Sequence, residues 1–129
     1  MDLDQYFKGT KGTGVLATAD NQGRVDAAVY ARPYIMDGGT TAFIMPDRLT
    51  HQNLQSNDHA AYLFVEEGIG YKGIRLFLTK VREETEGELI ETVRQGKYGA
   101  ACGEEENCFY LVHFTVDKVL PLVGAEEIS

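Results

Sequence analysis

The chain has 129 residues, of which 43% are hydrophobic and 25% are charged, and its formal net charge is −8 at pH 7. This length suits one globular domain with a buried core. The negative charge argues against nucleic acid or an anionic membrane surface as the main partner, because both require an extended basic patch. A local basic pocket for one small phosphate group remains compatible with this charge.

Along the chain, the hydrophobic pattern predicts a single domain over residues 1–129. Asp2 is placed to cap a first short helix in which Leu3, Tyr6 and Phe7 share one face. Strands are predicted, in chain order, at 14–19, 24–36, 41–46, 60–67, 74–85 and 108–123. Short helices are predicted at 50–57 and 86–95, and turns at DNQG (20–23) and DGGT (37–40).

These elements indicate a mainly β fold. Strands and helices do not alternate regularly, so a doubly wound parallel sheet is not expected. A closed or half-closed antiparallel barrel fits best, since closure removes exposed sheet edges. The last strand is apolar on both faces at Tyr110, Leu111, Val112 and Phe114, more than one small core can use, which predicts an exposed apolar surface and a dimer.

Targeting signals are not evident in the sequence. The first residues, MDLDQYF, lack the basic and apolar regions of a signal peptide. The longest apolar run, AAYLFV at 60–65, is too short to span a bilayer. We therefore expect a cytoplasmic protein with no membrane association, in which Cys102 and Cys108 are reduced thiols; a bridge between them is the alternative.

Several motifs are not expected to bind a dinucleotide, supply a nucleophile or hold a metal. GIGYKG (68–73) matches Gly-x-Gly-x-x-Gly, but it leads into a strand, so we interpret it as a loop whose Lys72 could reach a ligand. Neither Ser56 nor Ser129 lies in a nucleophile elbow. The histidines and cysteines lack zinc-site spacing, so no metal is expected. The acidic runs at 82–88 and 103–108 are typical of solvated faces.

MPDRLTHQNLQSN (45–57) is the most informative stretch, because a strand hands over to a helix through an Asp-Arg-Leu-Thr corner. One interpretation is structural: Thr50 caps the helix, Leu54 packs inward and Arg48 is solvated. The other is a phosphate site. The free N–H groups of a helix N-terminus, the Thr50 hydroxyl and the Arg48 guanidinium would all donate to phosphate oxygens, and FIMP (43–46) would line an apolar slot.

The whole chain resembles the pyridoxamine 5'-phosphate oxidase-like family of FMN-binding split barrels, in particular its short single-domain members. Three segments carry the resemblance: residues 14–64, GIRLFLTKV (73–81) and YLVHFTVDKVLPLVG (110–124). The resemblance implies a six-stranded antiparallel split barrel with two or three short helices. It also implies a homodimer that holds the flavin in a groove at the subunit interface.

The resemblance also implies particular contacts. The strand along the flavin maps to Ala27–Arg32, including Ala28, Val29, Tyr30 and Arg32, and the strand end at the ring maps to Met45 and Pro46. The phosphate corner maps to Arg48 and Thr50, supported by Asn53. Arg75 is the candidate for the pyrimidine edge of the ring, where a cation such as Arg75 or Lys72 would stabilise reduced flavin.

Departures from the family pattern keep the function open. Thr50 stands where a lysine is common, and the C-terminal region that completes the vitamin-phosphate site is absent. We therefore expect an FMN-dependent oxidoreductase of unknown substrate and electron donor. The alternative is a non-catalytic protein that binds or carries FMN, F420 or haem, and a third possibility is a barrel with a vestigial pocket. His51 is the titratable candidate near the corner, although a histidine on a helix surface is more often solvated or capping.

Overall fold

The computed structural model describes residues 1–95 and 109–128. Its main element is a seven-stranded antiparallel sheet with the order β2-β1-β5-β6-β7-β4-β3. The strands are β1 (Gly12–Ala19), β2 (Val25–Val29), β3 (Tyr34–Ile35), β4 (Thr41–Pro46), β5 (His59–Glu66), β6 (Gly73–Glu84) and β7 (Phe109–Pro121). The helices are α1 (Leu3–Lys8), α2 (Leu49–Ser56) and α3 (Glu88–Gln95), with a short 3-10 turn η1 (Asp37–Gly39).

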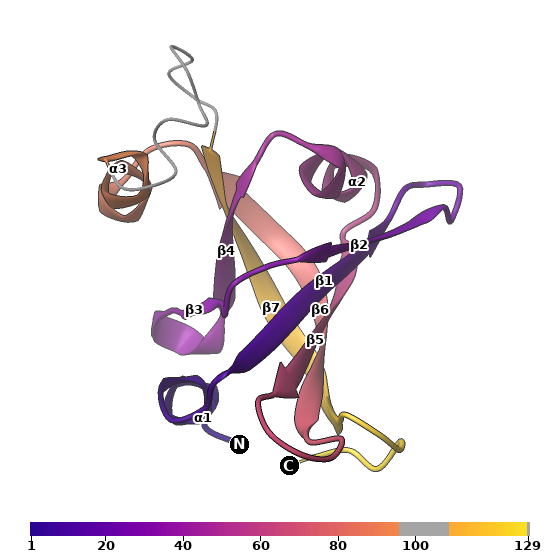
Figure 1. Ribbon diagram of the computed structural model, residues 1–129. Coiled ribbons are helices and arrows are strands. Elements are labelled where there is room, and N and C mark those ends of the chain that lie inside the picture. Colours follow the sequence, from indigo (N-terminus) through magenta and orange to yellow (C-terminus); the bar gives the residue numbers. More distant parts are fainter. Residues whose placement is uncertain (96–108, 129) are drawn as a thin grey trace.

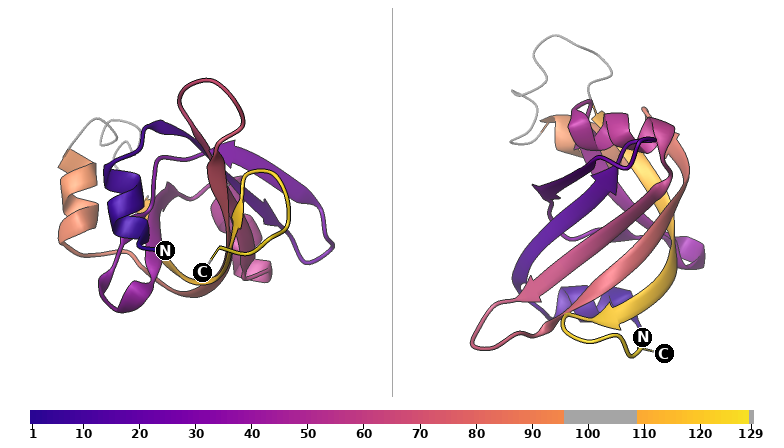
Figure 2. Two further views of the ribbon diagram at one scale, coloured as in Figure 1. Left: turned by 90° about the horizontal axis from the view of Figure 1, so that it is seen from below. Right: turned by 90° about the vertical axis from the view of Figure 1, so that its right-hand side faces the viewer.

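The sheet is strongly curved and curls on itself (Figures 1 and 2). Its two edge strands, β2 and β3, are consecutive in the chain. No ladder joins β2 to β3 in the described part of the chain, so hydrogen bonds do not close the barrel. The mainly β, antiparallel prediction is confirmed, whereas a six-stranded barrel is not what the structure has. One strand over 24–36 was wrong: the strand breaks after Val29, because Pro33 has no N–H for a ladder and restricts Arg32.

The core fills the inside of the curled sheet. Alternate residues of each strand point inward, as in β6, where Ile74, Leu76 and Leu78 are buried between more exposed neighbours. The other main members are Leu16, Phe43, Met45, Tyr62, Phe64, Val112 and Phe114. Helix α1 covers the end of the barrel near the termini and inserts Phe7 into this core (Figure 2).

A second, smaller apolar cluster lies on the outer side of β4 and β7. Ile90 of α3 packs there against Ala42, Phe109 and Leu111, and all four are buried. The two faces of β7 are therefore both used within one chain, Val112 and Phe114 inside and Leu111 outside. This corrects the reason given for a dimer, because these side chains do not form an exposed apolar surface.

Three further expectations concern the glycine-rich stretch, the two cysteines and membrane-spanning helices. The glycine-rich stretch 68–73 is a loop between β5 and β6, as predicted, and Gly68, Gly70 and Gly73 have positive φ. Cys102 and Cys108, with the acidic run 103–108, lie outside the described residues. Among the described helices, none combines the length and the apolar character needed to cross a membrane.

Candidate functional site

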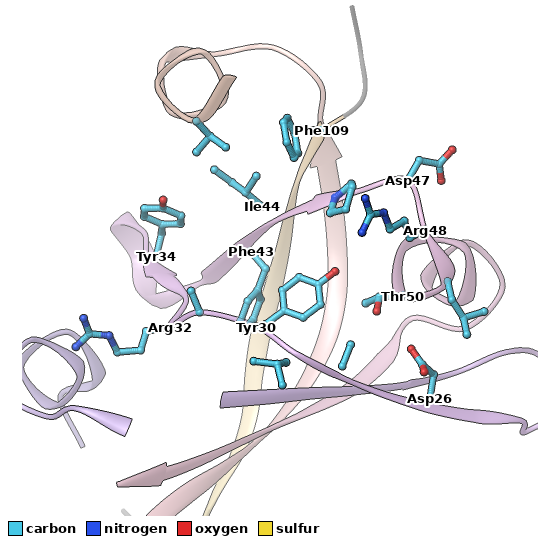
Figure 3. Close-up of a pocket in the computed structure, with 16 residues that line it drawn as sticks. Asp26, Tyr30, Arg32, Tyr34, Phe43, Ile44, Asp47, Arg48, Thr50 and Phe109 are labelled. Atoms are coloured by element: carbon cyan, nitrogen blue, oxygen red, sulfur yellow. The ribbon is translucent and has the colours of Figure 1, made fainter. Parts of the chain in front are cut away.

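A pocket of about 590 Å³ opens between β2, the segment that follows it, β4 and the start of α2 (Figure 3). This volume is in the range of small-molecule sites. Its lining residues are Asp26, Ala28, Val29, Tyr30, Ala31, Arg32, Tyr34, Phe43, Ile44, Pro46, Asp47, Arg48, Leu49, Thr50, Val93 and Phe109. The structure thus brings together most of the residues selected from the sequence: Ala28, Val29, Tyr30, Arg32, Pro46, Arg48 and Thr50.

Tyr30 forms the central wall of the pocket. Its backbone N–H donates to the Gly14 carbonyl at 3.0 Å, and its own carbonyl accepts from the Tyr62 hydroxyl at 3.1 Å. Its ring stands edge-on to Phe43, with centroids 6.2 Å apart. Burial raises the pKa of the Tyr30 phenol, and a hydrogen bond with Thr50 and the charge of Arg48 oppose this rise. The phenol is therefore held in place as a neutral group beside Thr50.

The corner after β4 is built differently from the expectation. Helix α2 begins at Leu49 with Arg48 as its N-cap residue, so the prediction that Thr50 caps the helix was wrong. Thr50 is instead the second helical residue, and its side chain is buried beside Tyr30. No side chain forms a capping hydrogen bond at Arg48. The first N–H groups of α2 therefore lack a side-chain acceptor and can donate to a ligand.

The two arginines of the pocket differ in how their charge is used. Arg48 is exposed and its guanidinium points into the pocket in Figure 3. Its side chain makes no hydrogen bond or ion pair with a described residue, and only its backbone is bonded, to Pro46 and Gln52. Arg32 donates to the backbone carbonyls of Phe7 and of Thr10, the latter at 2.9 Å. The guanidinium of Arg32 therefore holds the end of α1 and the segment after it, while that of Arg48 is available to an anion.

The opposite wall is apolar. Ile44 and Pro46 are two positions apart on β4 and therefore share one face of the strand, and Phe109 of β7 and Val93 of α3 also line the pocket. Phe43 and Pro46 belong to the stretch expected to line an apolar slot. The contributions of Val93 and Phe109 were missed, since they are more than 40 positions away from the corner and no local pattern connects them to it.

Three selected residues do not line this pocket. Met45 points into the barrel core and is fully buried, because it alternates with the outward-facing Ile44 and Pro46. Asn53 is buried and donates to the Thr18 hydroxyl at 3.1 Å. Arg75 donates to the carbonyls of Pro121, at 2.9 Å, and Gly124, so its charge serves the C-terminal segment. Lys72, on the glycine-rich loop, is also not among the lining residues.

His51 was interpreted as a solvated or capping histidine on the surface of a helix, and this was wrong. The residue is 5% exposed and its ring stacks on Tyr110, with centroids 3.8 Å apart. Its two nitrogens lie 2.8 Å from Asp47 and 2.9 Å from Glu83. The helix surface at this point faces β6 and β7 rather than solvent, which the short helical pattern alone could not reveal.

Metal ligands do not gather anywhere in the part of the chain that the structure describes. No group of three or more His, Cys, Asp or Glu side chains there is arranged to hold an ion. The described lining of this pocket offers the Arg48 guanidinium, uncapped backbone donors, and aromatic and aliphatic walls, together with the carboxylates of Asp26 and Asp47.

Comparison with solved structures identifies the class of fold. An FMN-binding protein from Syntrophomonas wolfei subsp. wolfei superimposes with a TM-score of 0.70 at 18% identity, over 93% of this chain and 83% of that one. The haem-storage protein HutZ from Vibrio cholerae gives 0.68 at 18% identity, over 92% of each chain. A candidate pyridoxamine 5'-phosphate oxidase from Lactobacillus delbrueckii gives 0.66 at 12% identity, over 93% and 92%.

No family model matches the sequence. No curated protein matches it either. The structural likeness therefore shows the fold alone: this chain has the same fold as these FMN-binding, haem-storage and pyridoxamine 5'-phosphate oxidase-like structures. The resemblance predicted from the sequence is confirmed at that level.

Proposed function

We propose that this protein binds FMN, with the phosphate at the corner between β4 and α2 and the flavin ring in the pocket. One observation carries the proposal. Arg48 presents a guanidinium without a described partner at the start of a helix whose first N–H groups have no side-chain cap, and both features face one pocket. An anion placed there would receive charged and neutral hydrogen bonds together.

The remaining walls suit a flat aromatic ring. Ile44 and Pro46 offer an apolar surface, and Pro46 has no N–H that a ring edge would leave unpaired. The segment from Ala28 to Arg32 lines the other side of the pocket, where its backbone is held by the pairing of β2 with β1 and by the hydrogen bonds of Tyr30 to Gly14 and Tyr62. When bound, the flavin would supply the redox chemistry, and the chain would bind it, orient it and exclude water from it.

Among the described residues that line the pocket, none is His, Cys or Met. This favours FMN over haem, whose iron is most often held by one of those side chains. The similarity to HutZ keeps haem as an alternative to test, and F420 is a second alternative. An FMN-dependent oxidoreductase is the function we favour. A non-catalytic carrier is the competing function, because no lining side chain has an evident role in acid–base catalysis.

A homodimer belongs to the same proposal. Val29, Leu49 and Tyr34 line the pocket and remain 75%, 54% and 40% exposed in the single chain. Apolar side chains gathered at the edge of a site are typical of a surface covered by a partner. A second copy seated on this rim would complete the groove around the ring, and the alternating exposed face of β2 would continue the interface.

The test is a titration of the protein with FMN and with riboflavin, in which quenching of flavin fluorescence reports binding. We expect FMN to bind much more tightly than riboflavin, and Arg48→Ala to weaken FMN by roughly 10- to 150-fold, the equivalent of about 1.5–3 kcal/mol for a charged hydrogen bond. Riboflavin affinity should be the same in both proteins. Lys118→Ala, which removes an equal charge beside Phe77, is the matched control and should bind FMN normally.

Equal affinity for FMN and riboflavin would remove the phosphate site. A Soret band in the purified protein would identify haem instead. Steady-state reduction of the bound flavin by NADH or NADPH, with turnover, would separate the oxidoreductase from the carrier.

A further inference from the structure

The hydroxyl groups of Tyr30 and Thr50 meet in the wall of the pocket. They come from different elements, since Tyr30 directly follows β2 and Thr50 is the second residue of α2. A hydrogen bond joins the two side chains, and the charge of Arg48 also acts on the phenol. In Figure 3, the Tyr30 hydroxyl points toward the side of the pocket that holds Arg48 and Thr50. The pair therefore belongs to the corner at which the anion is proposed to bind.

A count of hydrogens shows that this pair keeps one donor in reserve. Each hydroxyl has one hydrogen to donate and can also accept. The bond between them uses one hydrogen, whichever group donates it, and neither hydroxyl is hydrogen-bonded to any other residue in the described part of the chain. Asp26 also lines the pocket and its charge acts on the phenol, but it accepts no hydrogen bond from either hydroxyl. The second hydrogen is therefore free for a ligand in the pocket.

Both hydroxyls are held in place before a ligand arrives. The backbone of Tyr30 is bonded to Gly14 and Tyr62, its ring stands edge-on to Phe43, and Thr50 is only 4% exposed. Donors fixed in this way lose little conformational entropy when a ligand binds. Burial raises the pKa of the Tyr30 phenol, so the group keeps its hydrogen at neutral pH and does not repel an anion.

We propose that Tyr30 and Thr50 form a hydroxyl pair that donates a hydrogen bond to the phosphate of the ligand, beside the Arg48 guanidinium and the first N–H groups of α2. The pair joins the β2 side of the pocket to the corner, so two elements hold the phosphate rather than one. A phosphate monoester has three terminal oxygens, and the site then offers three kinds of donor. This inference rests on the proposed FMN site. It assigns the Tyr30 hydroxyl to the phosphate, whereas the family resemblance places this residue along the flavin.

The experiment measures the affinities for FMN and for riboflavin in the wild type, Tyr30→Phe, Thr50→Val and the double variant. We expect each single change to weaken FMN about two- to tenfold, the usual range for one neutral hydrogen bond, and to leave riboflavin unchanged. The double variant should lose less than the product of the two single losses, because both changes remove the same donor pair. Tyr71→Phe is the matched control: Tyr71 is 84% exposed and lies outside the pocket lining, so its loss of a hydroxyl should change neither affinity.

The ratio of FMN affinity to riboflavin affinity separates the possible outcomes, because a merely structural role would weaken both ligands alike. A ratio in Tyr30→Phe equal to that of the wild type overturns the hydroxyl pair and leaves the Arg48 site intact. Single losses that multiply fully in the double variant show two independent hydroxyls and also overturn the pair. If Tyr30→Phe folds poorly, the ratio in Thr50→Val decides, since valine keeps the shape of threonine and lacks only the hydroxyl. A wild type without preference for FMN overturns the proposed function and this inference with it.

Discussion

The Tyr62 hydroxyl donates a hydrogen bond to the backbone carbonyl of Tyr30 at 3.1 Å, and it reaches this carbonyl across the space that a side chain at position 14 would occupy. A Cβ atom on Gly14 would lie 1.8 Å from that hydroxyl oxygen and 2.7 Å from the Tyr30 carbonyl oxygen. Tyr62, a fully buried residue of β5, thus positions the Tyr30 wall of the pocket. It can do so only because residue 14 on the neighbouring strand β1 has no side chain.

Gly14→Ala should therefore destabilise the protein and disturb the pocket together. The added methyl group cannot be accommodated without moving Tyr62, and overpacking of this kind costs about 1–3 kcal/mol in the free energy of unfolding. Urea denaturation measures the loss. FMN affinity should fall as well, since Tyr30 lines the site.

Gly9→Ala is the matched control, because its nearest neighbour would be an ordinary 3.6 Å away and its φ is −96°. Its stability should stay within about 0.5 kcal/mol of the wild type. If Gly14→Ala proved as stable as Gly9→Ala, the close approach of Tyr62 to Gly14 would not exist in solution.

His113 on β7 is the second buried histidine, and its surroundings contrast with those of His51. It is 1% exposed, and neither ring nitrogen forms a hydrogen bond with a described residue. Burial lowers the pKa of the His113 imidazole, and the charge of Arg82 acts in the same direction, while Glu84, 3.5 Å from Nε2, opposes it. The folded protein therefore favours the neutral ring.

Stability should consequently fall in mild acid. Below about pH 6.5, the usual value for a free histidine, the unfolded chain binds a proton that the folded chain resists, so the free energy of unfolding decreases as pH decreases. Urea midpoints at pH 7.5 and pH 5.5 measure the effect. His113→Leu should be less sensitive over the same interval, because apolar replacement of an unpaired polar group removes the linkage.

Two results would contradict this assignment. One is a parallel loss of stability in the wild type and in His113→Leu. The other, which needs no variant, is an NMR titration in which the His113 ring of the wild type protonates at or above pH 6.5.

Much of the fold follows from local sequence signals. The runs GVLATA, TAFIMP and IRLFLTKV are rich in apolar, β-branched and aromatic residues, and the turns between strands contain Gly, Asn and Asp, so most strands were predicted within a residue or two. The break at Arg32-Pro33 was missed, although proline chemistry is a local signal, because the flanking residues favour a strand on both sides.

The residues that line the pocket were predictable where they are close together in the sequence. They were not predictable where they come together only through tertiary packing. Arg48 and Thr50 follow from the corner that they form. Met45 was misplaced relative to the pocket because the alternation of β4 was not applied to choose its face. Arg75 and His51 depend on which strand packs against them, and Val93 and Phe109 on how α3 covers β7. These are tertiary relationships without a local pattern.

The last prediction concerns the rim of the pocket. Val29 lies on the edge strand β2, pairs with Val15 of β1 and is 75% exposed. Its side chain therefore contributes little to the stability of the single chain. Val29→Glu should leave the folded monomer intact, because a charged side chain at an exposed edge position remains hydrated and tends to protect the edge. At a dimer interface the same charge would be desolvated against apolar side chains, which is strongly unfavourable.

Multi-angle light scattering distinguishes the two situations. We expect the wild type at micromolar concentration to have twice the chain mass of 14.3 kDa, and Val29→Glu to approach the mass of one chain. FMN affinity should fall together with the loss of the dimer, because the partner would complete the groove. Val123→Glu is the control: Val123 is 67% exposed but lies outside the pocket lining, so it should preserve both mass and affinity. A monomeric wild type with FMN bound would show that one chain holds the cofactor alone, and the exposed rim of Val29, Leu49 and Tyr34 would then require another explanation.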